Sequence, residues 1–165
     1  MGRTITKLIG GVLVVLAATG TVFLVGMRRK SPLVLDTVRR TSRAMKPLAL
    51  RSAGTPGASA SVIRHVGRTT GRTYETPVGA VATGDGFVIA LPYGPNTDWL
   101  KNVLVSGSAI IVDEGTAYDV DRPHVVPMAE AGHHFSPEDQ RAHRMFGVDD
   151  CLRVRRVVQD RPLPD

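Results

Sequence analysis

The chain of 165 residues has a formal net charge of +6 that is divided unevenly along its length. Residues 1–51 hold 10 of the 21 Lys and Arg residues and one of the 15 acidic residues, whereas residues 52–165 carry a net −3. The absence of a basic stripe from the later part argues against nucleic-acid binding. The single cysteine, Cys151, excludes an internal disulfide and a multi-cysteine metal site, and its apolar neighbours indicate a buried structural thiol.

Residues 8–27 form an uncharged, apolar run. A helix of about 20 apolar residues is long enough to cross the hydrocarbon core of a bilayer. A secretory signal peptide is the alternative, but its apolar region is shorter and ends at a small-residue cleavage site. This run continues into Arg28-Arg29-Lys30 without such a site. We therefore predict that residues 1–30 are a retained, single-pass membrane anchor.

The basic residues around this run predict its orientation. Two Lys and Arg residues precede it and eight follow it up to Arg51. Because positively charged flanks stay in the cytoplasm, we expect a cytoplasmic C-terminal domain at the cell membrane. Residues 31–60 are predicted to be a basic juxtamembrane helix, over 33–50, and a Gly/Pro/Ser-rich linker. That amphipathic helix could lie on the lipid surface or cap the domain as a solvated helix, and the sequence leaves both open.

Residues 61–158 are predicted to be one folded domain, followed by a tail over 159–165. Alternating polar and apolar residues predict short strands, and Thr97 and Ser136 are expected to cap two helices. The expected strands are 61–66, 74–82, 87–91, 109–112, 116–120 and 152–158; the expected helices are 98–105, 127–135 and 136–146. Six short strands with few helices predict a mainly β (α+β) domain, a small antiparallel β-barrel.

No nucleophile elbow, phosphate-binding loop or metalloprotease motif occurs in the sequence. His133, His134 and His143 could meet at a metal, but adjacent histidines point in different directions on a helix, and we predict no metal site. A turn-rich domain without acid–base machinery suits an enzyme whose cofactor carries the reactive chemistry.

Two segments have the composition of an anion or cofactor site. Residues 67–72, GRTTGR, combine glycines, hydroxyls and two guanidiniums, which together recognise phosphate or carboxylate; an ordinary basic hairpin turn is the alternative. Residues 91–102 run from a Gly/Pro loop into the start of a helix, a common anion site. Here the alternative is a core tryptophan, Trp99, with Asn102 as a polar neighbour.

The two segments, in this order and separated by a strand that contains T-P-V and by an apolar strand, resemble the deazaflavin-dependent nitroreductase family of split β-barrel proteins. The resemblance covers about 61–126 and the strand at 152–157. It implies a split β-barrel that binds coenzyme F420, a deazaflavin with a phosphate and a polyglutamate tail. The chain has fewer cations than the best-known members, with Thr69 in the place of a lysine.

The resemblance also implies roles for individual residues. The phosphate or tail would contact Gly67, Arg68, Thr69, Thr70 and Arg72. The deazaflavin ring would lie against Pro92, Tyr93 and Gly94, with Asp98, Trp99 and Asn102 completing the pocket. No catalytic residue is assigned, and Tyr93 and Tyr118 are candidate proton donors.

The function expected from this resemblance is hydride transfer from reduced F420 to a lipophilic acceptor such as a quinone, a lipid or a nitro-aromatic compound. The alternatives are a split barrel that binds flavin mononucleotide or haem, and a non-catalytic, membrane-tethered module that binds lipid or a partner protein. We expect a small-molecule substrate and a membrane as partners, and a homodimer is compatible with such a barrel.

Overall fold

The computed structural model describes residues 20, 21 and 23–157, with the side chain of Arg39 excepted. All strands belong to one antiparallel sheet in the order β2-β1-β5-β6-β7-β4-β3. The strands are β1 (Ser61–Val66), β2 (Thr73–Val78), β3 (Ala80–Ala82), β4 (Gly86–Ala90), β5 (Ser108–Asp113), β6 (Thr116–Pro127) and β7 (Asp150–Arg156). The helices are α2 (Pro32–Ala49), α3 (Asp98–Ser106), α4 (Met128–Ala131), the 3-10 turn Gly132–His134 and α5 (Pro137–Phe146).

The two edge strands of this sheet are neighbours in the sequence. β2 and β3 lie at opposite ends of the strand order, yet only Gly79 separates them. The sheet must therefore curl until its two edges approach each other. This curled antiparallel sheet with a few helices fits a split barrel, as predicted, and the expected strand 74–82 is divided into two at Gly79.

The hairpin β1–β2 follows the sequence prediction closely. Its strands pair from Ser61 opposite Val78 to Val66 opposite Thr73. The backbone N–H of Gly67 donates to the carbonyl of Arg72 at 2.8 Å and closes the predicted turn. Ser61, Val62 and Ile63 are all buried at the start of β1, and burial alternates from Ile63 to Val66, which is the pattern expected of a strand with one face toward the core.

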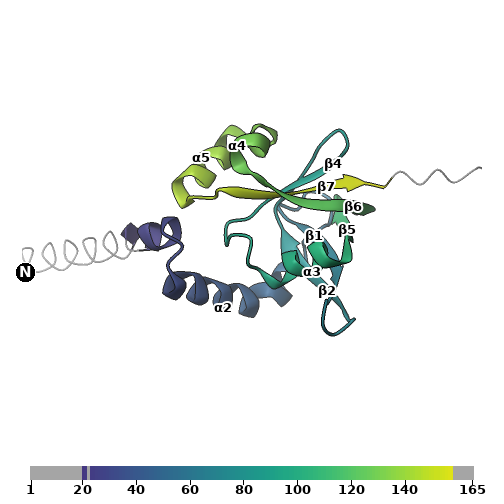
Figure 1. Cartoon of the computed structure of the whole chain (residues 1–165), viewed down its shortest axis with the longest axis horizontal. Helices are drawn as coiled ribbons and strands as arrows, with labels where there is room; N and C mark the ends of the chain where they lie inside the picture. The colour runs from purple at the N-terminus through teal and green to yellow at the C-terminus, as the bar shows by residue number, and fades with distance from the viewer. Residues whose placement is uncertain (1–19, 22, 158–165) are drawn as a thin grey trace, which may run out of the picture.

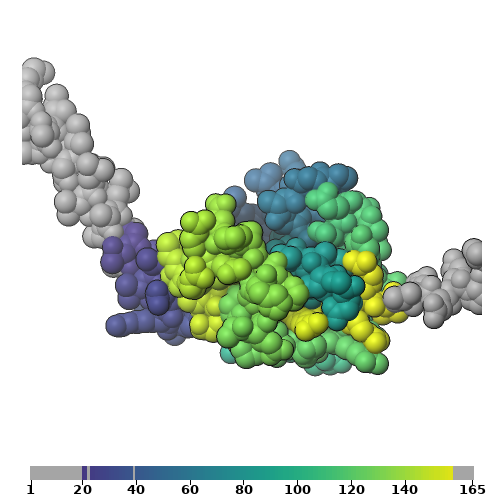
Figure 2. All heavy atoms as spheres, turned by 90° about the horizontal axis from the view of Figure 1, so that it is seen from above, coloured from purple at the N-terminus to yellow at the C-terminus, as the bar shows by residue number. Residues whose placement is uncertain are grey.

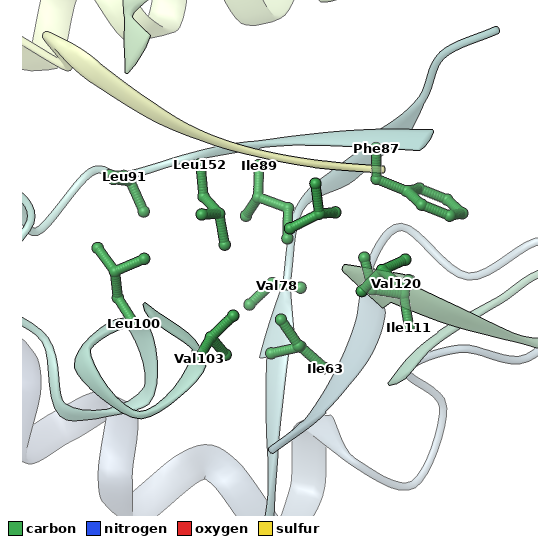
Figure 3. Close-up of a cluster of buried hydrophobic side chains, with 11 residues drawn as sticks. Ile63, Val78, Phe87, Ile89, Leu91, Leu100, Val103, Ile111, Val120 and Leu152 are labelled. Atoms are coloured by element: carbon green, nitrogen blue, oxygen red, sulfur yellow. The ribbon is translucent and has the colours of Figure 1, made fainter. Parts of the chain in front are cut away.

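The main core lies inside the curl. Figure 3 shows side chains from β4 and β7 pointing toward those of β1, β5, β6 and α3. Leu100 and Val103 place the inner face of α3 against this cluster, and both are fully buried. Burying each such aliphatic side chain contributes about 1.5–3 kcal/mol. This packing fixes the position of α3, which carries Asp98, Trp99 and Asn102 of the residues predicted for a cofactor.

A second apolar cluster lies under α4 on the opposite face of the sheet. Figure 1 shows α4 and α5 on one side of the sheet, away from α2, and Figure 2 shows that they cover only part of that face. Cys151 belongs to this cluster with Phe135 and is fully buried. Burial raises the pKa of the Cys151 thiol to about 11, with a smaller contribution from Asp150. The prediction of a buried structural thiol is confirmed.

The segment after Val120 differs from the prediction. β6 continues to Pro127, beyond the expected strand 116–120, and the expected helix 127–135 is present as two short pieces, α4 over Met128–Ala131 and the 3-10 turn Gly132–His134. A register shift between Asp121 and His124, with Arg122 at a φ of 51°, interrupts the alternation by which strands are found in a sequence. The pairing of the second half of β6 with β7 nevertheless keeps it in the sheet.

The predicted anchor over residues 8–27 lies mostly outside the described residues. Within residues 20, 21 and 23–157, no helix has both the length and the apolar character needed to cross a membrane. The predicted juxtamembrane helix is present as α2, which begins at Pro32 and ends at Ala49. Leu33, Met45 and Leu48 of this helix are exposed.

Candidate functional site

A pocket of about 260 Å³ lies where β2 turns into β3 and β4 leads into α3. The loop after β4 contributes Pro92, Tyr93 and Gly94 to the pocket wall, and the first turn of α3 contributes Trp99. These four residues are among those that the sequence predicted for a cofactor ring. The complete lining is Ala60, Pro77, Val78, Gly79, Ala90, Leu91, Pro92, Tyr93, Gly94, Thr97 and Trp99.

Two glycines keep the pocket open. A Cβ added at Gly79 or at Gly94 would meet no atom within 4 Å, so the backbone at both positions borders open space. Gly94 also has a φ of 72°, which L side chains rarely adopt. A flat ligand could therefore approach the backbone closely at these two positions.

Thr97 precedes α3 and lines the same pocket. The sequence predicted that its hydroxyl caps the helix, but the side chain makes no capping hydrogen bond. Thr97 Oγ1 is instead buried and has no hydrogen-bond partner within the described part of the chain. A buried hydroxyl without a partner costs free energy, and this one belongs to a residue of the pocket lining.

The helix α2 contacts the pocket loop. The hydroxyls of Ser42 and Tyr93 lie 3.2 Å apart and share a hydrogen bond. Tyr93, one of the two candidate proton donors, is thus tied to the helix that follows the predicted anchor. The other candidate, Tyr118, does not line the pocket; its ring lies 5.3 Å from that of Phe87 and 4.3 Å from the Arg156 guanidinium.

Arg68, in the turn between β1 and β2, reaches across to α3. Its Nη1 donates to Asn102 Oδ1 at 2.8 Å, and its Nη2 forms an ion pair with Asp98 Oδ1 at 3.0 Å. The Arg68 backbone N–H also donates to Asn102 Oδ1, at 3.2 Å. These contacts hold the turn against the first two turns of the helix whose N-terminus borders the pocket.

A buried histidine continues this network inward. Asn102 Nδ2 lies 3.2 Å from His65 Nδ1, and His65 Nε2 lies 3.3 Å from Thr76 Oγ1. His65 is only 5% exposed and Asn102 is 6% exposed. Burial, with the positive charge of Lys46 as a smaller cause, lowers the pKa of His65 to about 4. The imidazole is therefore neutral at neutral pH.

The rest of the turn is compact at one end and open at the other. A Cβ at Gly67 would come within 2.5 Å of Thr70 Oγ1 and 2.6 Å of the Tyr74 ring, so a larger residue there would require these two side chains to move. Thr70 Oγ1 shares a hydrogen bond with the Tyr74 hydroxyl at 3.1 Å. At the other end, Arg72 is exposed, and its guanidinium has no hydrogen-bond or ion-pair partner among residues 20, 21 and 23–157.

The sequence-predicted residues thus fall into two adjacent groups. Pro92, Tyr93, Gly94 and Trp99 line the pocket. Arg68, Asp98 and Asn102 form the network beside it, with Gly67, Thr69, Thr70 and Arg72 in the same turn as Arg68. Sequence reasoning did not single out His65; its place two residues after Ile63, on the buried face of β1, was the available signal.

The three later histidines form no metal site. The described residues contain no cluster of three or more His, Cys, Asp or Glu side chains that could hold a metal ion. The rings of His133 and His134 lie 4.0 Å apart, while His143 packs edge-on against Phe135 at 4.7 Å. Burial lowers the pKa of His143, with Asp139 acting in the opposite direction.

Comparison with known proteins finds similarity at the level of structure. No protein-family model matches the chain, and no curated protein matches it. A structure described as an F420 reductase matches with a TM-score of 0.46 and 10% identity, over 66% of this chain and 92% of the other. At these values the likeness does not assign the chain to a family.

Two further solved structures have comparable scores. HutZ, the haem storage protein from Vibrio cholerae, has a TM-score of 0.44 and 14% identity, over 62% of this chain and 84% of its own. A structure described only as a domain-swapped dimer has a TM-score of 0.45 and 14% identity, over 71% of this chain and 96% of its own.

Proposed function

We propose that the chain is an F420-dependent oxidoreductase that binds the deazaflavin ring in the pocket between Gly79, the Pro92–Gly94 loop and Trp99. The observation that carries the proposal is the position of this pocket beside the basic turn 67–72. One end of the site is thus apolar and aromatic, and the other is cationic. An extended cofactor with a flat ring and an anionic tail requires these two environments side by side.

The pocket residues fit a flat heteroaromatic ring. Val78, Leu91, Pro92 and Trp99 offer apolar walls, and Gly79 leaves the backbone accessible. The buried hydroxyl of Thr97 would pair with a polar atom at the edge of the ring. Small-molecule sites generally combine a mostly apolar lining with a few placed polar groups.

When bound in its reduced form, a deazaflavin supplies a hydride from C5. The chain's own residues would orient the ring, keep water out and hold the acceptor within about 3–3.5 Å of the reacting carbon. Tyr93 lines the pocket and its hydroxyl is tethered by Ser42, and in this proposal it would deliver a proton to the reduced acceptor. Tyr118 packs against Phe87, outside the pocket lining, and is not assigned this role as a proton donor.

The proposed acceptor is a lipophilic molecule, a quinone, a membrane lipid or a nitro-aromatic compound, and the proposed location is the cytoplasmic face of the cell membrane. Support for this location comes from the apolar run at 8–27 and the basic residues after it. The contact between α2 and Tyr93 would keep the pocket close to that membrane. Homodimer formation stays a prediction.

The test is titration of F420 fluorescence with the full-length chain in detergent micelles. We expect saturable quenching in the wild type and weakening of about tenfold or more in Gly79→Val, whose side chain would enter the pocket. Gly84→Val is the matched control, because its Cβ also meets nothing within 4 Å but lies in the β3–β4 turn, away from the pocket.

Three outcomes of this experiment separate the alternatives. No quenching by a folded wild-type chain would rule out the proposed cofactor. An absorbance spectrum of bound flavin mononucleotide or haem in the purified protein would instead identify the split barrel with another cofactor, although no histidine lines this pocket to bind a haem iron. Binding to lipid vesicles alone, with no cofactor, would favour the non-catalytic module.

A further inference from the structure

Asn102 lies next to the pocket but does not line it. The residue is buried between α3 and β1, where its amide joins the turn arginine on one side to a buried histidine on the other. The resemblance that selected Asn102 implied a place in the cofactor pocket. Its contacts in the structure point to a different task.

The direction of each hydrogen bond in this network follows from Arg68, which can only donate. Asn102 Oδ1 therefore accepts from Arg68, and Asn102 Nδ2 must face His65 as a donor. His65 Nδ1 accepts this bond, so the single proton of the neutral imidazole is on Nε2 and is donated to Thr76. Each of these hydrogen bonds thus pairs a donor with an acceptor, and together they hold the Asn102 amide in one orientation.

The two arginines of the turn differ in what they contact. Arg68 is engaged by the Asp98 carboxylate, the Asp98 carbonyl and the Asn102 amide. Arg72 stands exposed at the end of the same turn, with its guanidinium unpaired within the described residues. Three of the five N–H donors of the Arg68 guanidinium are thus occupied, and a ligand at Arg68 would compete with these partners for its charge, whereas a ligand at Arg72 would displace only water.

We propose that Asn102, oriented by His65, is a positioning residue that fixes Arg68 and the 67–72 turn, and that Arg72 supplies the charge that meets the anionic part of the ligand. This inference rests on the proposed function for the identity of the ligand. The fixing of the turn is a property of the chain itself and is testable without any ligand.

The first experiment compares the salt dependence of F420 binding in three variants of the full-length chain. Arg72→Ala should weaken binding about tenfold and flatten its dependence on NaCl, because an exposed charge pair is screened by salt. Arg68→Ala should keep the salt dependence of the wild type while lowering the melting temperature. Arg64→Ala, which removes an exposed arginine of the same hairpin, is the control. Equal flattening in Arg68→Ala and Arg72→Ala would overturn the division of roles.

The second experiment measures hydrogen exchange of the turn in the ligand-free, full-length chain. In Asn102→Leu the Arg68 amide loses its acceptor, and we expect exchange in residues 67–72 to accelerate about tenfold. Asn102→Asp retains an acceptor for Arg68 and should restore slow exchange. Should Asn102→Leu fail to fold, Asp98→Asn weakens the same attachment from the solvent side and should accelerate exchange of the turn alone.

The two experiments distinguish a wrong cofactor from a wrong positioning role for Asn102. Absence of F420 binding in the wild type, with accelerated exchange in Asn102→Leu, would refute the proposed cofactor and keep Asn102 as the positioning residue. Unchanged exchange of residues 67–72 in both Asn102→Leu and Asp98→Asn would refute the positioning role, whatever the cofactor. The β3–β4 turn at Thr83–Gly86 serves as the internal reference and should exchange equally in all variants.

Discussion

Two glycines, one where β4 pairs with β7 and one between β2 and β3, differ in what surrounds them. At Gly86, where β4 meets β7, an added Cβ would lie 2.0 Å from the Val154 carbonyl oxygen and 2.8 Å from Arg155 Cα. At Gly79, between β2 and β3, an added Cβ would meet nothing within 4 Å. The β4–β7 seam therefore depends on close backbone approach, whereas the β2–β3 hinge leaves the backbone open to a ligand.

This difference separates a region that stabilises the fold from a region that can contact a ligand. The seam is buried on both sides, with Val88 and Cys151 on one face and Ile89 and Leu152 on the other. The hinge borders the pocket and has solvent on its outer side. Stability should be sensitive to substitution at the seam, and binding should be sensitive to substitution at the hinge.

The largest effect is expected for Gly86→Ala. Since the clash is with backbone atoms of β7, the strands must separate, and we expect the free energy of unfolding to fall by about 4 kcal/mol or more. Urea unfolding of the full-length chain, followed by circular dichroism, measures the loss. Gly84→Ala in the adjacent turn is the control and should change stability by less than about 1 kcal/mol. A folded Gly86→Ala chain of wild-type stability would show that the seam can widen freely.

The next effect concerns pH and His65. Its pKa is lowered to about 4 in the folded chain, below the ordinary value of 6.5, so the unfolded chain binds the proton more readily. Stability from this residue is fully present above pH 6.5 and is lost as the pH falls toward 4, by up to about 3 kcal/mol. Lys46 is the cation whose charge adds to this lowering of the pKa, and Tyr74 stacks on the ring.

His65→Gln isolates this contribution, because glutamine does not titrate. The variant should be less stable than the wild type at neutral pH, and its unfolding free energy should decline less steeply between pH 6.5 and 4. The partly buried His143 titrates in the same direction in both proteins and cancels in the comparison. Parallel pH curves for the two chains would show that His65 does not carry the dependence.

A smaller effect is expected for Thr97→Val on the hinge side. Valine removes the buried hydroxyl that has no partner in the described chain, and the extended backbone at this position suits a β-branched residue. We expect the ligand-free chain to gain about 1 kcal/mol in thermal or urea unfolding. Binding of F420 should weaken in the same variant, and a gain in both stability and affinity would exclude the hydroxyl from the site.

The smallest effect is expected for Arg64→Ala. Arg64 Nε and Glu75 Oε1 lie 2.7 Å apart on the outer face of the β1–β2 hairpin, with both side chains more than two-fifths exposed. Exposed ion pairs contribute about 0.5 kcal/mol or less, and salt screens them. A melting temperature clearly below that of the wild type would mean that the outer face of this hairpin is in contact with something else.

Local patterns predicted the hairpin β1–β2, its turn and α3 from the sequence, because each is specified by residues close together in the chain. Ser136, for example, accepts a hydrogen bond from the Asp139 backbone N–H, as its place before Pro137 indicated. The second half of β6 could not be predicted in this way. Its place in the sheet depends on pairing with the distant strand β7, from His124 opposite Arg153 to Pro127 opposite Asp150, after a register shift.

Composition indicated the two segments of the candidate site but not the contacts between their residues. The residue types of the turn and of the loop after β4 indicated where a ligand could bind, and the structure places the two segments next to each other. The sequence could not show that Arg68 and Asn102 would bind each other. That contact depends on the packing of α3 against β1, which long-range core residues such as Leu100 determine.

The position of Gly79 has a consequence for the order in which the molecule assembles. β2 and β3 are adjacent in the chain but lie at the two ends of the sheet, so both can be in place only when all the strands between them have paired. The pocket includes Val78 and Gly79 and is therefore complete only when the whole sheet has formed. A ligand of this pocket would bind only the finished barrel, and by mass action it would slow the exchange of every strand at once.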